Sequence, residues 1–92
     1  MAIMATVRFT RNLQRHVECP TEQVAAGTLR EALDAYFASR ALARDYVLDD
    51  RGTLRKHMAA FINGRQIEDR LHLSDPLDDD AVIDIVQSLS GG

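Results

Sequence analysis

The segment that decides the fold is Thr28-Leu29-Arg30-Glu31-Ala32-Leu33-Asp34-Ala35-Tyr36-Phe37. Its first four residues match a capping box, in which the Thr28 hydroxyl accepts from an orphan backbone amide and the Glu31 carboxylate reaches back toward the start of the helix. The apolar residues behind the box recur at the spacing of one helical stripe; they are Leu29, Ala32, Leu33, Tyr36 and Phe37. The pattern predicts one amphipathic helix whose apolar side must be covered by another element.

The segments on both sides of this helix show the period of two that is typical of strands. We expect a strand over Ile3 to Phe9, a turn over Arg11 to Gln14 and a short second strand over Arg15 to Cys19. The last strand is predicted over Ala81 to Val86. In that strand, Ile83 and Ile85 should face the core, and the other face should carry Val82, Asp84 and Val86.

The clearest hairpin signal is Asn63-Gly64 at the centre of Ala59 to Ile67. Asn-Gly is the preferred pair for a two-residue type I′ turn, because both central residues need positive φ. Turns are also predicted at Asp49-Asp50-Arg51-Gly52 and, within the irregular segment from Leu71 to Pro76, at Ser74-Asp75-Pro76. The segment Ala38 to Leu48 extends the helix or forms a second short one, and both alternatives stay open.

The element order is therefore strand, strand, helix, strand, short strand, strand. It predicts an α+β fold, with a mixed four- to five-stranded sheet packed on one main helix. We expect one domain over residues 1–86 and a flexible C-terminal tail over residues 87–92.

Composition disfavours several classes of partner. The 92 residues carry a net charge of −3, whereas proteins that bind nucleic acid regardless of sequence are usually basic. No apolar run reaches the roughly 18–20 residues needed to cross a bilayer, and the first residues lack the pattern of a signal peptide. Cys19 is the only cysteine, so no internal disulfide can form and a cytoplasmic location is the expectation.

Few side chains suggest intrinsic catalysis or metal binding. Cys19 could be a nucleophile, but a lone cysteine is more often a small packed apolar residue. No two histidines have the spacing of a zinc motif; the three are His16, His57 and His72. The run Asp78-Asp79-Asp80 lacks the alternating ligands of a calcium loop, which favours a solvated turn. No Gly-rich phosphate loop is present.

Charge is distributed unevenly along the chain. The middle is basic, with Arg51, Arg55, Lys56 and Arg65, and the C-terminal third is acidic. This distribution is equally consistent with an ordinary solvated surface and with steering of a partner.

The chain ends in Leu89-Ser90-Gly91-Gly92. A terminal carboxylate becomes reactive when an enzyme converts one of its oxygens into a leaving group, for example by adenylation with ATP. Such an enzyme must take the terminus into a narrow cleft, and glycine suits this because it lacks Cβ and adopts any φ. The last strand would supply a rigid base for this tail.

The sequence resembles the MoaD/ThiS family of sulfur carriers, including its CysO-like members. The matching pieces are Val7-Arg8-Phe9, Thr28-Leu29-Arg30-Glu31-Ala32-Leu33 and Phe61-Ile62-Asn63-Gly64, followed by the segment from Leu77 to Ile85 that leads into Gly91-Gly92. Together they cover almost the whole chain in order. The resemblance implies a ubiquitin-like β-grasp, with the first and last strands side by side at the centre of the sheet.

The resemblance also implies a carrier rather than an enzyme, although such a chain can be the small subunit of a sulfur-transferring synthase. A ubiquitin-activating-enzyme-like adenylyltransferase would use ATP to adenylate the Gly92 carboxylate, and a sulfur donor would then leave a thiocarboxylate. Gly91 would give clearance, and a sulfur-accepting synthase would receive the sulfur. The chain would bind no metal or cofactor itself and would be monomeric when free.

Val86 and Leu89 would form a small apolar docking patch beside the reactive terminus. The tail Gln87-Ser88-Leu89-Ser90 is more polar than in many family members, and Ala38 to Leu48 is longer than in the most compact ones. These departures leave open whether molybdopterin, thiamine, cysteine or tRNA-thiolation pathways receive the sulfur. We expect that no proteolytic trimming is needed to expose the Gly92 carboxylate. A protein modifier joined to lysines through Gly92, or a binding module with an inert tail, are the alternatives.

Overall fold

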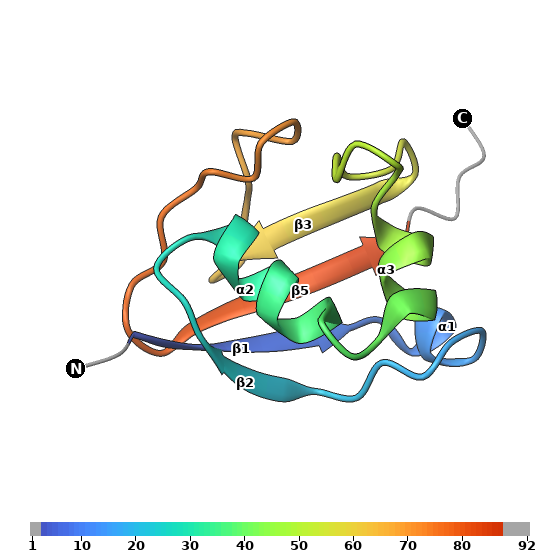
Figure 1. The fold of residues 1–92 in the computed structure, drawn as a ribbon. Helices are drawn as coiled ribbons and strands as arrows, with labels where there is room; N and C mark the ends of the chain where they lie inside the picture. The colour runs from blue at the N-terminus through green and yellow to red at the C-terminus, as the bar shows by residue number, and fades with distance from the viewer. Residues whose placement is uncertain (1–2, 88–92) are drawn as a thin grey trace.

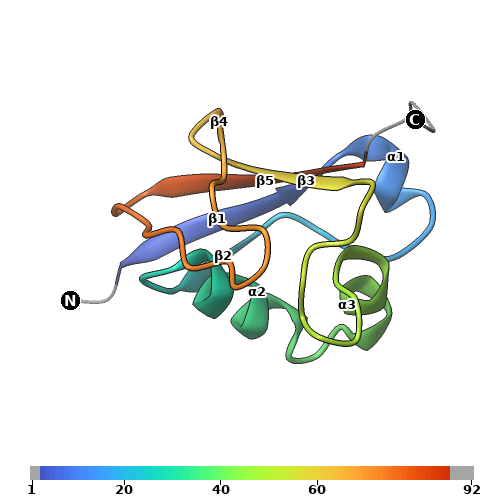
Figure 2. The same ribbon diagram turned by 90° about the horizontal axis from the view of Figure 1, so that it is seen from above.

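The computed structural model describes residues 3–87 and shows a five-stranded mixed sheet with three helices. The strand order is β2-β1-β5-β3-β4. The strands are β1 (Met4–Phe9), β2 (Glu22–Ala25), β3 (Met58–Ile62), β4 (Arg65–Gln66) and β5 (Ala81–Gln87). The helices are α1 (Arg11–Gln14), α2 (Leu29–Phe37) and α3 (Ala41–Val47), with α2 and α3 on the same side of the sheet (Figures 1 and 2). No helix within residues 3–87 is long and apolar enough to cross a membrane.

The capping box predicted for the main helix is confirmed. The Thr28 hydroxyl accepts from the Glu31 amide at 3.2 Å, and the Glu31 carboxylate accepts from the Gly27 amide at 2.9 Å. The five apolar residues predicted for its stripe are all buried. A cap of this kind stabilises a helix by about 1 kcal/mol.

The segment from Ala38 to Leu48 forms a second helix and does not extend the first. The backbone leaves helical geometry at Arg40, where φ is −135° and ψ is 65°, and α3 begins at the next residue. Ala43 and Val47 of α3 are buried, so this helix completes the cover over the sheet.

The prediction of a second strand over Arg15 to Cys19 is wrong. Residues 11–14 form the single turn of α1, which brings Leu13 into the core, and β2 begins only at Glu22. The Thr10 amide still donates to the carbonyl of Ile85 in β5, and the chain then turns into α1 and forms no tight hairpin. The return segment therefore pairs with the start of β1, with Ala25 opposite Met4 and Val24 opposite Ala5.

The Asn63-Gly64 hairpin is confirmed, with φ of 52° at Asn63 and 82° at Gly64. The Asn63 side chain also accepts from the Val82 amide at 2.9 Å, which ties the hairpin to β5. The turn at Asp49 to Gly52 is confirmed as well, since the Asp49 carboxylate accepts from the Arg51 amide at 2.9 Å.

The predicted turn at Ser74-Asp75-Pro76 is wrong, because the turn lies at residues 70–72. The Asp75 carboxylate instead accepts from the amides of Glu68 and Asp69. Asp75 thus holds the irregular segment in place by its side chain.

The two terminal strands are neighbours at the centre of the sheet, as the resemblance implies. β1 pairs with β5 in parallel, from Ala5 opposite Ala81 to Phe9 opposite Ile85. Ile83 and Ile85 are fully buried under the helices, which confirms the predicted alternation. The chain therefore folds as an α+β ubiquitin-like β-grasp.

Candidate functional site

The end of β5 is the part of the structure from which the predicted reactive tail continues. β5 lies between β1 and β3, and its last two residues still pair with β3: Val86 lies opposite Ala59, and Gln87 opposite Met58. The pairing of β5 with β1 stops at Ile85, so Val86 and Gln87 pair with β3 alone. The chain thus stays in the sheet up to Gln87.

Three of the predicted site residues lie outside the residues that the structure describes: Leu89, Gly91 and Gly92. The predicted tail, residues 87–92, begins with Gln87, which the structure includes in β5. Val86 is described, and it lies half-buried on the sheet face opposite α2 and α3. We call this the outer face.

An ion pair lies on the outer face next to Val86, at the residue of β5 that precedes Val86 on this face. Arg8 of β1 stands opposite Asp84 of β5 in the parallel ladder. The Arg8 Nε and Nη2 atoms donate to the two Asp84 oxygens at 2.8 and 3.0 Å. This two-point contact with Asp84 raises the pKa of Arg8, and the opposite charges of the two side chains offset each other locally.

Apolar side chains surround that pair. Phe61 lies opposite Asp84, and Val82 lies two residues before it on the same face. The outer face near the end of β5 therefore consists of half-buried apolar groups around a neutralised pair, a composition suited to the centre of a protein interface.

The Arg8–Asp84 pair was not predicted from the sequence, although two polar residues on outward positions of adjacent strands could have indicated it.

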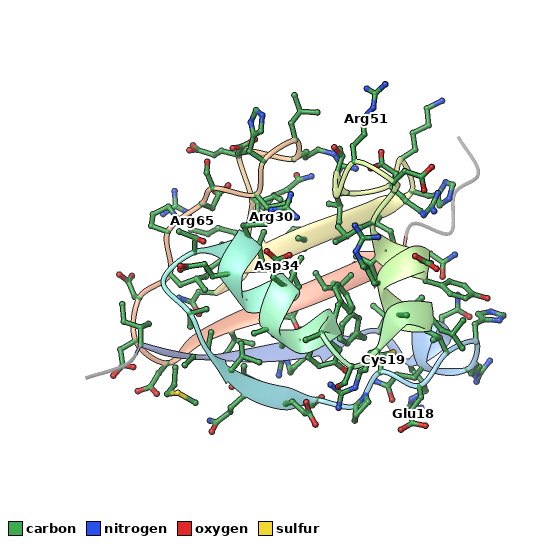
Figure 3. The ribbon with its side chains drawn as sticks, viewed as in Figure 1. Glu18, Cys19, Arg30, Asp34, Arg51 and Arg65 are labelled. Carbon is green, nitrogen blue, oxygen red and sulfur yellow. The ribbon has the colours of Figure 1, made fainter. Side chains whose placement is uncertain are left out.

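Cys19 is packed in the protein interior, as the more common of its two interpretations predicts. Its side chain is buried, and burial raises the pKa of its thiol. Figure 3 shows Cys19 beneath the layer formed by α3, next to Glu18. A buried thiol with a raised pKa forms little thiolate and is a poor nucleophile.

The scattered acidic and histidine side chains form no metal cluster within residues 3–87. The run Asp78-Asp79-Asp80 makes the turn that leads into β5, as predicted: the Asp79 carboxylate accepts from the Met4 amide at 3.2 Å, and φ at Asp80 is 64°. This run aligns the two central strands.

The basic residues of the middle segment do not form one patch. Arg65 follows β3, whereas Arg51, Arg55 and Lys56 precede it, and Figure 3 shows Arg51 and Arg65 far apart. A five-residue strand spans about 17 Å, so Arg65 lies at the opposite end of the sheet from the other three.

A comparison of the sequence with known protein families gives a match: the profile of the ThiS family matches residues 6–92. The chain belongs to the ThiS family. The match covers both the grasp domain and the tail, and it confirms the resemblance drawn from the sequence. Proteins of this family are small ubiquitin-like carriers and generally not enzymes. A search of curated proteins found no match.

Solved structures confirm the ThiS-family fold. SAMP1 from Haloferax volcanii superposes with a TM-score of 0.78 at 21% identity, over 97% of this chain and 99% of that one. A chain of the BexX/CysO complex from Amycolatopsis orientalis gives a TM-score of 0.78 at 17% identity, over 96% of this chain and 99% of that one. The complex of subunits 1 and 2 of molybdopterin-converting factor from Helicobacter pylori gives 0.66 at 22% identity, over 98% and 100%. The last two structures are complexes with partner proteins.

Proposed function

We propose that the chain is a sulfur carrier whose Gly92 carboxylate is the group that carries the sulfur. The observation that carries this proposal is the family match, which runs from the grasp domain through Gly92. The position of β5 supports it, since the strand that leads to the tail lies at the centre of the sheet and pairs with both β1 and β3.

The chemistry needs two steps. An adenylyltransferase of the ubiquitin-activating-enzyme class joins a Gly92 carboxylate oxygen to the α-phosphorus of ATP and releases pyrophosphate. A hydrosulfide ion from the sulfur donor then attacks the acyl carbon, AMP leaves with that oxygen, and loss of the sulfur-bound proton gives the thiocarboxylate. The chain provides no catalytic group in either step. Gly91 gives the backbone clearance that a narrow cleft requires.

The outer face is the surface that we propose for partner docking, with Val86 at its end and Leu89 continuing it. Removing apolar groups from water drives most protein association, and the Arg8–Asp84 pair adds no net charge that the partner must compensate. A sulfur-accepting synthase would use the same terminus after activation. The acceptor pathway is molybdopterin, thiamine or cysteine biosynthesis, or tRNA thiolation.

The test compares the full chain with a variant that lacks Gly91-Gly92. The adenylyltransferase of the same organism should catalyse ATP–pyrophosphate exchange with the full chain and show only background exchange with the shortened one. Equal exchange with both chains would refute the role of Gly92.

A second candidate is a ubiquitin-like modifier, favoured by the similarity to SAMP1, a small archaeal modifier protein. Both functions require the same activation, so the distinction lies in the acceptor. Isopeptide-linked products that resist reducing denaturing gels support the modifier, and sulfur at the terminus supports the carrier.

A further inference from the structure

A groove lies on the helix side of the sheet, beside the end of β5. It measures about 340 Å³, and the residues that line it include Leu42, Asp45, Tyr46, Arg55, Met58 and Gln87. We call it the α3 groove, because Leu42 and Tyr46 of α3 line it; Figure 1 shows α3 near the end of β5. It lies on the opposite side of the sheet from the outer face.

Two apolar side chains of α3 are unusually exposed at this groove. Leu42 is 75% exposed, the highest value among the large apolar residues within residues 3–87, and Tyr46 is 40% exposed. They lie four positions apart and therefore on one side of the helix. The Tyr46 ring stacks on the exposed His16 ring, with centroids 6.2 Å apart. Two large apolar side chains exposed next to each other are typical of a contact site.

The groove is continuous with the exit of the reactive chain. Gln87 lines it and is the last residue of β5, and Met58, also in its wall, pairs with Gln87. A standard interface covers about 800 Å² on each partner, a disc of about 16 Å radius. The seven residues of α3 extend only about 10 Å. An interface of this size that is centred on the point where the chain leaves β5 reaches both the end of the outer face, at Val86, and the groove.

We propose that the α3 groove is a specificity contact for the activating adenylyltransferase, which places an apolar depression over Leu42 and Tyr46. The inference rests on the proposed function. Arg55 supplies the polar part of the contact: its Nε donates to the carbonyl of Asp45 at 2.7 Å, which fixes the guanidinium at the groove. The complementary partner carries a carboxylate opposite Arg55.

The test is a steady-state measurement with Leu42→Asp. With the adenylyltransferase of the same organism, KM for the variant should rise about tenfold or more, the effect expected for loss of a hot spot, with kcat nearly unchanged. Leu71→Asp is the matched control, because Leu71 is 64% exposed but lies in the loop at residues 70–72, away from the groove. Leu71→Asp should leave KM unchanged. Circular dichroism of both variants verifies their fold.

An unchanged KM for folded Leu42→Asp would overturn this inference and leave the proposed function standing. Failure of the wild-type chain to be adenylated at all would instead refute the proposed function. Two further outcomes would assign the groove to another occupant and overturn the inference. If light scattering shows that the wild-type chain self-associates and that Leu42→Asp abolishes this, the occupant is a second copy of the chain. If deletion of residues 88–92 shifts the Leu42 methyl resonances, the occupant is the tail of the same chain.

Discussion

Replacing Ile85 with alanine should lower the free energy of unfolding by about 3–4 kcal/mol, whereas Val86→Ala should lower it by less than about 1 kcal/mol. The two residues are neighbours in β5, but Ile85 is fully buried and Val86 is half-buried on the outer face. The Ile85 site lies between Phe9 of β1 and Ala60 of β3 in the ladder. Strands paired on both sides can close a cavity only in part, so the cost lies above the lower end of the usual range of about 2–5 kcal/mol.

The assay is urea unfolding followed by circular dichroism. A domain of this size is stable by about 5–14 kcal/mol, so the Ile85 variant should remain folded in water. With an m value of about 2 kcal/mol/M, the Ile85→Ala midpoint should fall by about 1.5–2 M and the Val86→Ala midpoint by less than 0.5 M. Equal losses, or a larger loss for Val86, would refute the assignment of faces in β5. Val86 would then not be available for docking on the outer face.

Substitutions at three further positions test local features of the fold. Thr28→Ala should lower the free energy of unfolding by about 1 kcal/mol in urea melts because the helix loses its cap, and Thr28→Ser should restore most of it. Gly64→Ala should destabilise the hairpin by about 1 kcal/mol in the same assay, because φ there is 82° even though no atom lies within 4 Å of an added Cβ; Gly64→Asn should be milder. Hydrogen bonds from the His72 amide and the Ser74 hydroxyl lower the pKa of Asp69 from 3.8 to about 2. Its contribution to stability is therefore complete above about pH 4 and is lost as the pH falls toward 2. In thermal melts, Asp69→Asn should reduce this acid-dependent loss, and an unchanged pH dependence would contradict the role assigned to Asp69.

The elements predicted correctly depend on interactions between residues close in the sequence. The capping box spans Thr28 to Glu31, and the Asn63-Gly64 turn needs only two residues with positive φ. The alternation in β5 is equally local, because successive side chains of a strand point to opposite faces. Such signals are complete within a few residues and do not depend on the rest of the fold.

The errors arose where distant residues decide the structure. Arg15 to Cys19 alternates like a strand, yet β2 forms over Glu22–Ala25 because the chain turns through α1 and its Leu13 enters the core. The segment from Ala38 to Leu48 could not be assigned because the break at Arg40 depends on how α3 packs onto the sheet. The α3 groove was missed for the same reason: Leu42 and Tyr46 are near Gln87 only in the folded chain.

The candidate site was predicted in part. Val86 could be placed on the outer face from alternation alone, whereas its neighbour pair Arg8–Asp84 required the parallel register of β1 and β5. The roles of Gly91, Gly92 and Leu89 remain predictions from the sequence and the family match.

The intact mass of the chain tests the sulfur-carrier proposal most directly. The chain is incubated with ATP, a sulfur donor and an adenylyltransferase of the same organism that has been verified as active with this chain by pyrophosphate exchange. We predict the mass increase of one oxygen replaced by sulfur, located by fragmentation at Gly92. An unchanged terminus under these conditions, with AMP released and every Gly92 still a carboxylate, would contradict the account.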